Sequence, residues 1–240
     1  MQNILTLEAV SRVFPDGTTA LEDVSFTAFQ GDFIVIAGSN GSGKTVLMNL
    51  IAGLDSPTKG SITLLYGAKA GLVFQDADAQ ILGETPEEDV AFGARNCGLK
   101  KDELKNCVHK ALQSCGLLHK KDFPARQMSG GEKRRLAVAG ILAMNCPLLI
   151  FDEPFANLDY DGVRQVCSIL KQLKSDGKTI ILLTHEIEKI LALANRFIIL
   201  NKGKIRFDGS VEEGLNLNLE DFSIRNPIHS YNCIEDLLWL

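Results

Sequence analysis

The chain begins with a region in which apolar and polar residues alternate, and it continues with short runs that are apolar throughout. Alternation within residues 5–9 and 24–28, with Pro15-Asp16-Gly17 between them, predicts antiparallel strands over residues 4–29. The next segment, Phe33–Ala37, is a continuous apolar run, which is typical of a strand buried on both faces of a sheet. The N-terminal part of the chain is therefore predicted to contain two kinds of strand.

A Gly-rich turn follows this run, and a predicted helix follows the turn. Apolar residues recur there at helical spacing, namely Leu47, Leu50, Ile51 and Leu54. Three later apolar runs are Leu148–Phe151, Thr179–Leu183 and Phe197–Leu200. Because helical stretches flank the first two of these runs, the strands are predicted to be parallel. The predicted fold class is α/β, with a mainly parallel sheet as its core and an antiparallel β-subdomain at the N-terminus.

One part of the chain shows a helical pattern with no strand pattern nearby. The apolar residues of one predicted helical face are Leu104, Val108, Ala111, Leu112 and Cys115. Pro124 then interrupts this pattern. We therefore expect an inserted α-helical subdomain, about residues 86–135, within a single domain that spans residues 1–240. The tail, about residues 211–240, has a mixed pattern from which no role follows.

The composition is that of a globular protein and excludes several classes of function. The 240 residues include 25 Lys plus Arg and 30 Asp plus Glu, which gives a net charge of −5, and 45% are hydrophobic. Disordered and fibrous proteins have different compositions. General nucleic-acid binding is disfavoured because it depends on Lys and Arg. The longest apolar run, Leu136–Met144, has less than half of the roughly 20 residues that cross a bilayer.

The N-terminus and the cysteines indicate a cytoplasmic setting. Residues 1–8 lack the basic start and the apolar run of a secretory signal. The six cysteines form no Cys-x-x-Cys pair and have no spacing to histidine that suits zinc. We therefore expect reduced thiols that pack as small apolar residues.

The Gly-rich turn carries the pattern G-x-x-x-x-G-K-[ST]. Its residues are Gly38, Ser39, Asn40, Gly41, Ser42, Gly43, Lys44 and Thr45. The turn lies between a predicted buried strand and a predicted helix, so that backbone N–H groups and the positive end of the helix can face phosphate oxygens. Lys44 is expected to reach the β- and γ-phosphates, and Thr45 to ligate Mg²⁺. The pattern predicts a site for a nucleoside triphosphate with magnesium.

ATP is favoured over GTP as the nucleotide. Guanine recognition would use Asn-Lys-x-Asp, whereas residues 201–204 read Asn-Lys-Gly-Lys and predict a hairpin turn instead. Kinases and motors share the phosphate loop with ATPases, so other motifs must identify the class.

Two adjacent acidic residues, Asp152 and Glu153, directly follow the apolar run 148–151. Open α/β sheets bind their ligands at the carboxyl edge of the strands, which is where these acids and the phosphate loop are expected to meet. Asp152 is predicted to hold Mg²⁺. Glu153 is predicted to act as a general base towards the water that attacks the γ-phosphate.

A further motif precedes the carboxylate pair. Residues 128–135 read Met-Ser-Gly-Gly-Glu-Lys-Arg-Arg and lead into a predicted helix. Ser129 and Glu132 are spaced as a capping box, but a capping box does not require Gly130 and Gly131. With the other motifs in the same order, this segment resembles the signature of ATP-binding cassette ATPases. The resemblance covers nearly the whole chain.

This resemblance implies roles for several other residues. Phe14 is similar to the aromatic residue that stacks on adenine, although its place in a predicted strand suits a core residue equally well. Gln75 resembles the Q-loop glutamine that contacts Mg²⁺. Asp159, in an Asn-Leu-Asp segment, resembles the D-loop aspartate. His185, which follows the run 179–183, resembles the switch histidine that contacts the γ-phosphate.

The resemblance also implies a partner for the catalytic site. In this family the signature of one cassette, here Ser129 to Glu132, binds the γ-phosphate held by the phosphate loop of another. The active unit is therefore expected to contain two cassettes, which ATP closes and hydrolysis reopens. The complete set of motifs is compatible with a homodimer and with a pair of related chains.

Residues 71–93 are similar to the energy-coupling factor ATPases, which drive the uptake of cobalt, nickel or vitamins. This similarity implies a transmembrane scaffold that docks beside the Q-loop, with basic residues near the acidic run Glu84–Asp89. A solvated acidic segment at the start of a helix would give the same run. It also implies a membrane-embedded solute-binding subunit and a peripheral location at the cytoplasmic face of the membrane. The sequence does not identify the transported solute, because an ATPase subunit does not contact it.

Two other functions remain open. The ATPase of an ordinary importer or exporter would share every catalytic motif, and only residues 71–93 argue against it. Cassette proteins that act on ribosomes or DNA usually have two cassettes or long coiled-coil insertions, which this sequence lacks, so no nucleic-acid partner is expected.

The chain departs from the family in a short segment between Gly60 and Gln75, in Glu132 where glutamine is frequent, and in Phe155 and Asn157 of the D-loop.

Overall fold

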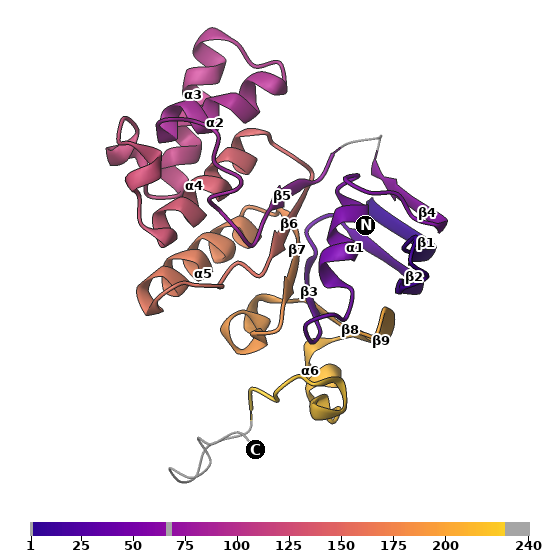
Figure 1. Cartoon of the computed structure of the whole chain (residues 1–240). Helices are drawn as coiled ribbons and strands as arrows, with labels where there is room; N and C mark the ends of the chain where they lie inside the picture. Colours follow the sequence, from indigo (N-terminus) through magenta and orange to yellow (C-terminus); the bar gives the residue numbers. More distant parts are fainter. Residues whose placement is uncertain (1, 66–68, 229–240) are drawn as a thin grey trace.

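The computed structural model describes residues 2–65 and 69–228, and these residues form two sheets with helices around them (Figure 1). The first sheet has the strand order β2-β1-β4 and is antiparallel. Its strands are β1 (Asn3–Val13), β2 (Thr19–Phe29) and β4 (Lys59–Leu64). The antiparallel strands predicted over residues 4–29 are confirmed, since β1 and β2 pair on either side of the predicted turn.

The second sheet has the order β5-β6-β7-β3-β8-β9, and only the pair β8 and β9 is antiparallel. Its strands are β3 (Phe33–Ala37), β5 (Gly71–Val73), β6 (Leu148–Asp152), β7 (Thr179–Thr184), β8 (Arg196–Asn201) and β9 (Lys204–Gly209). The predicted mainly parallel sheet is confirmed. Because the parallel strands share one direction, their carboxyl ends meet at one edge of the sheet.

Helices α2, α3 and α4 pack against one another to one side of the second sheet, and α1 lies between the two sheets (Figure 1). The α-helices are α1 (Lys44–Ile51), α2 (Pro86–Asn96), α3 (Lys101–Ser114), α4 (Gly130–Ala143), α5 (Tyr160–Ser175) and α6 (Val211–Leu215). Short 3₁₀ turns are η2 (Leu118–Lys120), η3 (Ala125–Gln127), η4 (Ile187–Lys189), η5 (Leu191–Leu193) and η6 (Leu219–Phe222). Within residues 2–65 and 69–228, no helix is long and apolar enough to span a membrane.

The parallel sheet separates two hydrophobic cores. Every residue of β3 is buried, with Phe33 and Val35 in one core and Ile34 and Ile36 in the other. The first core includes α2 to α5, and the second includes α1 and the antiparallel sheet. Burial on both faces explains why this strand is a continuous apolar run. A slip of one residue would exchange the two faces, so packing fixes the register.

Helix α1 ends earlier than its apolar spacing predicts. Gly53 has φ 71°, and the N–H of Leu54 donates to the carbonyl of Asn49 at 2.9 Å, as in a Schellman motif. Leu54 lies beyond the helix and is 61% exposed. Its assignment to the helical face is therefore wrong, because the glycine that ends the helix outweighs the spacing. Of the predicted tail, residues 211–228 are described and include α6 and η6, whereas residues 229–240 lie outside the described residues.

The hairpin predicted at residues 201–204 is present between β8 and β9. Lys202 and Gly203 have φ values of 49° and 73°, and positive φ at both central residues is typical of a two-residue type I′ hairpin turn. The N–H of Gly203 donates to the carbonyl of Ser42 at 2.9 Å, and the carbonyl of Gly203 accepts from the N–H of Glu22 at 2.9 Å. The turn thus joins the Gly-rich loop to the antiparallel sheet.

Gly203→Ala should destabilise the protein more than Gly177→Ala. Both glycines have φ 73°, where alanine costs about 1–2 kcal/mol. A Cβ at Gly203 would lie 2.6 Å from the carbonyl oxygen of Ala20, whereas nothing lies within 4 Å of one at Gly177. This clash should add about 1–3 kcal/mol. Denaturant unfolding of the two variants measures the difference, and equal losses of stability would show that the turn shifts freely.

Candidate active site

The Gly-rich loop, residues 38–43, joins the end of β3 to the start of α1 at the carboxyl edge of the parallel sheet. A Cβ at Gly43, which has φ 106°, would lie 2.7 Å from the carbonyl oxygen of Ala20. At Gly38 a Cβ would lie 2.3 Å from the carbonyl oxygen of Leu200. Only glycine fits such close approaches to β2 and β8. The intervening residues are Ser39, Asn40, Gly41 and Ser42.

The loop encloses the side chain of Lys44, which is 6% exposed. Its Nζ donates to the carbonyls of Gly38 and Ser39 at 2.7 and 3.1 Å. The same Nζ lies 3.6 Å from Oε1 of Glu153. A single positive charge is therefore held between the loop and the end of β6.

Asp152 ends β6 and is 3% exposed. The hydroxyl of Thr45 donates to its Oδ2 at 3.3 Å, while Oδ1 is buried without a partner in the described part of the chain. Burial, followed by the charge of Glu153, raises the pKa of Asp152, and the hydrogen bond from Thr45 opposes this rise. The structure thus brings together the hydroxyl and the carboxylate that the sequence assigns to one metal ion.

Glu153 follows β6 with φ 43°, a left-handed conformation that is uncommon for residues other than glycine. Its buried Oε2 accepts from the hydroxyl of Thr184 at 2.9 Å and from the N–H of His185 at 3.3 Å. Its Oε1 lies 3.0 Å from Nδ1 of His185, whose side chain is 50% exposed. Adjacent parallel strands therefore bring Glu153 and His185 together. Sequence reasoning missed Thr184, although it directly precedes the predicted histidine.

Gln75 lies just beyond β5, which pairs with β6, so it lies at the same edge as the two acids. The segment around it is held by Gln80: the N–H of Phe74 donates to Gln80 Oε1 at 3.0 Å, and Gln80 Nε2 donates to the carbonyl of Leu72 at 2.9 Å. Gln75 itself is exposed. The backbone of this loop is thus fixed while the glutamine side chain stays accessible.

Ser129 caps the N-terminus of α4, and the predicted capping box is present. The N–H of Glu132 donates to Ser129 Oγ at 3.3 Å, and the N–H of Ser129 donates to Glu132 Oε2 at 3.0 Å. Lys120 donates to Glu132 at 2.6 Å, and this bond is the main cause that lowers the pKa of Glu132. Gly130 is exposed, and a Cβ placed there would have nothing within 4 Å, while Gly131 follows in the first turn. The start of α4 therefore faces open space.

Asp159 caps α5, since its Oδ1 accepts from the N–H of Gly162 at 2.8 Å. The two unusual D-loop residues have structural explanations. Asn157 has φ 60°, which asparagine tolerates better than most residues, and Phe155 is buried in the core. A pocket of about 370 Å³ lies between this loop, the segment after Gln75 and the start of α4.

Phe14 lies just past the end of β1 and is half-buried. The guanidinium of Arg12 lies 5.3 Å from the centre of its ring and also pairs with Asp55 at 2.8 Å. The interpretation of Phe14 as a core residue of a strand is wrong, because the strand ends at Val13. Its stacking on adenine stays a prediction.

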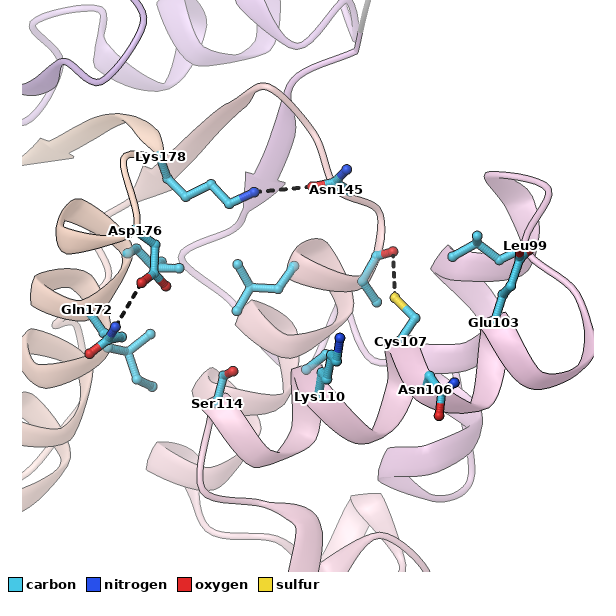
Figure 2. A pocket seen from close by; sticks show the side chains of 15 residues that line it. Leu99, Glu103, Asn106, Cys107, Lys110, Ser114, Asn145, Gln172, Asp176 and Lys178 are labelled. Atoms are coloured by element: carbon cyan, nitrogen blue, oxygen red, sulfur yellow. Dashed lines mark hydrogen bonds between the residues drawn. The ribbon is translucent and has the colours of Figure 1, made fainter.

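A separate cavity of about 590 Å³ lies between α3, α4 and α5, and none of the predicted site residues lines it (Figure 2). Several polar side chains at this cavity pair with one another. Lys178 donates to Asn145 at 3.1 Å, and Gln172 donates to Asp176 at 2.8 Å. The groups suited to catalysis therefore gather at the sheet edge and not in this cavity.

Comparison with known proteins agrees with this arrangement. Residues 21–156 match the family model described as ABC transporter. The energy-coupling factor transporter ATP-binding protein EcfA1 of Caldanaerobacter subterraneus subsp. tengcongensis is 39% identical over 230 residues, which cover 89% of this chain and 83% of that protein.

Solved structures extend the similarity to three dimensions. CbiO1 from Clostridium perfringens, part of the ABC transporter complex CbiONQ, is 33% identical with a TM-score of 0.81, covering 89% of this chain and 91% of that one. An ATP-binding cassette solved as a dimer in a post-hydrolysis state with ADP and phosphate is 27% identical with a TM-score of 0.77, covering 87% and 99%. Sequence, fold and the motifs at the sheet edge agree: the chain belongs to the ATP-binding cassette family of transporter ATPases.

Proposed function

We propose that this chain is the ATP-hydrolysing subunit of a membrane transporter of the energy-coupling factor type, which drives the uptake of a metal ion or vitamin. The observation that carries the proposal is the meeting of Lys44 and Thr45 with Asp152 and Glu153 at one edge of the sheet. The family supports ATP as the nucleotide. The similarity to EcfA1 supports the type of transporter.

The same edge suits Mg²⁺, which prefers oxygen ligands. Thr45, Asp152 and Gln75 would supply such oxygens beside those of the phosphates. The buried Oδ1 of Asp152 has no partner among the described residues, and a cation would relieve that cost. Across residues 2–65 and 69–228, no cluster of three or more His, Cys, Asp or Glu could hold a metal alone. This fits an ion that binds with the nucleotide and offsets the charge of its phosphates.

Glu153 is the proposed general base. Thr184 and His185 orient its carboxylate, so that it can take a proton from the water that attacks the γ-phosphate. Lys44 and the N–H groups of residues 38–43 would hold the phosphates. His185, which is half-exposed, would contact the γ-phosphate, and Phe14 would stack on adenine.

Glu153→Gln should keep nucleotide binding but lower ATP turnover by roughly 10²- to 10⁴-fold, because an amide keeps the hydrogen bonds and cannot accept the proton. Phosphate release measures turnover, and binding of a fluorescent ATP analogue reports on the folded site. Glu188→Gln, which removes an exposed carboxylate on η4, serves as the control. Turnover near that of the wild type in Glu153→Gln would contradict the assignment.

The active unit is proposed to contain two cassettes. Ser129 and Gly130 are exposed at the positive end of α4, which suits a phosphate. A related cassette with ADP and phosphate was solved as a dimer, which supports a pair in which each signature binds the nucleotide on the other's phosphate loop. Asp159 would lie at the same interface. A second copy of this chain and a related chain are both compatible with this arrangement.

Ser129→Arg should prevent ATP-dependent dimerisation and lower turnover by about 10²-fold or more, because a bulky side chain would occupy the phosphate surface. Size-exclusion chromatography with ATP, in the Glu153→Gln background, measures dimerisation, and phosphate release by Ser129→Arg with Glu153 intact measures turnover. Ser210→Arg is a matched control, since Ser210 forms an equivalent capping box at α6. If Ser129→Arg dimerised and turned over ATP like the control, the two-cassette arrangement would be wrong.

A membrane scaffold is proposed to dock beside the Q-loop. Leu82 and Phe92 are 69% and 49% exposed, and both line a small pocket of about 100 Å³ between α2 and α4. Glu84 and residues 87–89 add an acidic rim. Exposed apolar residues with a charged rim are typical of protein interfaces, and basic residues of a scaffold would complement the acids. Docking there would hold the chain at the cytoplasmic face of the membrane.

Affinity purification of the tagged chain from gently solubilised membranes should recover a transmembrane scaffold and a small solute-binding membrane protein. Phe92→Asp should lose the scaffold, because burying a carboxylate in an apolar interface is unfavourable. Leu54→Asp, at an exposed leucine beyond α1, should retain it. Mass spectrometry identifies the partners. Recovery of conventional paired permease subunits would instead assign the chain to an ordinary importer or exporter.

A further inference from the structure

An arginine of the signature helix reaches the backbone of the Q-loop. Arg134 lies in α4 and is 3% exposed, and its two terminal nitrogens donate to the carbonyls of Phe74 and Gln75. These carbonyls belong to consecutive residues directly after β5. One planar guanidinium thus holds both in a fixed orientation. It thereby fixes the backbone from which the Gln75 side chain projects.

The charge of Arg134 is influenced by acidic side chains of the site. Burial lowers the pKa of Arg134, and the charges of Asp76 and Asp152 act in the opposite direction. A buried cation costs free energy unless it is paired and hydrogen-bonded, and Arg134 Nε has no partner among the residues that the structure describes. An apolar side chain would avoid this cost. Unlike an apolar side chain, the guanidinium donates hydrogen bonds to two main-chain carbonyls.

Other contacts join the Q-loop to α4 as one unit. Lys133, next to Arg134, pairs with Asp78 at 2.5 Å, but Asp78 is 69% exposed, so this pair contributes little. A Cβ at Gly71 would lie 2.3 Å from Cγ2 of Ile141, so β5 and α4 touch without a gap. Arg134 is therefore the buried polar link between the signature helix and the Q-loop.

We propose that Arg134 is a positioning residue for Gln75: through the carbonyls of residues 74 and 75, it ties the glutamine to the signature helix and holds it in the orientation needed for ATP hydrolysis. The proposal rests on the role proposed above for Gln75. Arg134 acts through the main chain, so it affects the hydrolytic step more than the binding of nucleotide at residues 38–45.

A double-mutant cycle tests this role. Arg134→Gln, Gln75→Ala and the double variant of the full chain are compared for kcat, KM for ATP and melting temperature. Arg126→Gln, at an exposed arginine of η3, removes the same charge as a control. We expect Arg134→Gln to lower kcat about 10- to 100-fold with KM changed by less than about threefold. Combined with Gln75→Ala, it should cause little further loss.

The conservative variant and the cycle distinguish positioning from a structural role. Arg134→Lys keeps the charge and can reach one carbonyl, so it should retain intermediate turnover. Normal turnover in a folded Arg134→Gln variant would overturn the proposal. The proposal would also be overturned if the fold losses of kcat in Arg134→Gln and Gln75→Ala multiplied in the double variant, because the two residues would then act independently. If Arg134→Gln does not fold, wild-type turnover in Arg134→Lys would overturn it. A failure of the proposed function gives a different result from a failure of the proposal for Arg134. In the first case Glu153→Gln and Gln75→Ala would leave turnover unchanged.

Discussion

A balance of buried charges at the carboxyl edge of the parallel sheet organises this structure. In the described part of the chain, the charged side chains that are buried are Lys44, Arg134, Asp152 and Glu153, two of each sign. Each would be strongly unfavourable alone, and each lies close to opposite charge or accepts or donates hydrogen bonds. These residues come from α1, α4 and the end of β6. Their mutual neutralisation therefore requires these three elements to assemble.

Strand register determines where these charges lie. β7 lies between β6 and β3, and the pairing sets Asp152 opposite Leu183 and Ala37 opposite Thr184. The ends of three strands are consequently level, and the loop after Ala37 begins at the same sheet edge as the two acids, with β7 between them. Because β3 is apolar on both faces, packing against two cores prevents a slip in register. The packing of β3 against the two hydrophobic cores thus aligns the polar groups at the ends of the strands.

Much of the fold could be predicted from the sequence because its signals are local. Continuous apolar runs, the hairpin at residues 201–204 and the capping box of α4 each depend on neighbours within a few residues. Contacts between residues of distant segments could not be predicted. In the sequence Arg134 is one of several basic residues on a predicted helix, and Thr184 lies at the end of a predicted strand. The errors at Leu54 and Phe14 arose where an element ends, since apolar spacing continues past a terminating glycine or a last strand residue.

The left-handed backbone at Glu153 also limits which residues can occupy that position, apart from any role in catalysis. At φ 43° a β-branched side chain is strained, whereas glycine, asparagine and aspartate adopt such a conformation more readily. Mutational drift can therefore remove the carboxylate through asparagine or glycine while the turn after β6 survives, but valine or isoleucine would disrupt the turn itself. A duplicated gene for this chain consequently has a route to a cassette that keeps this turn but lacks the carboxylate.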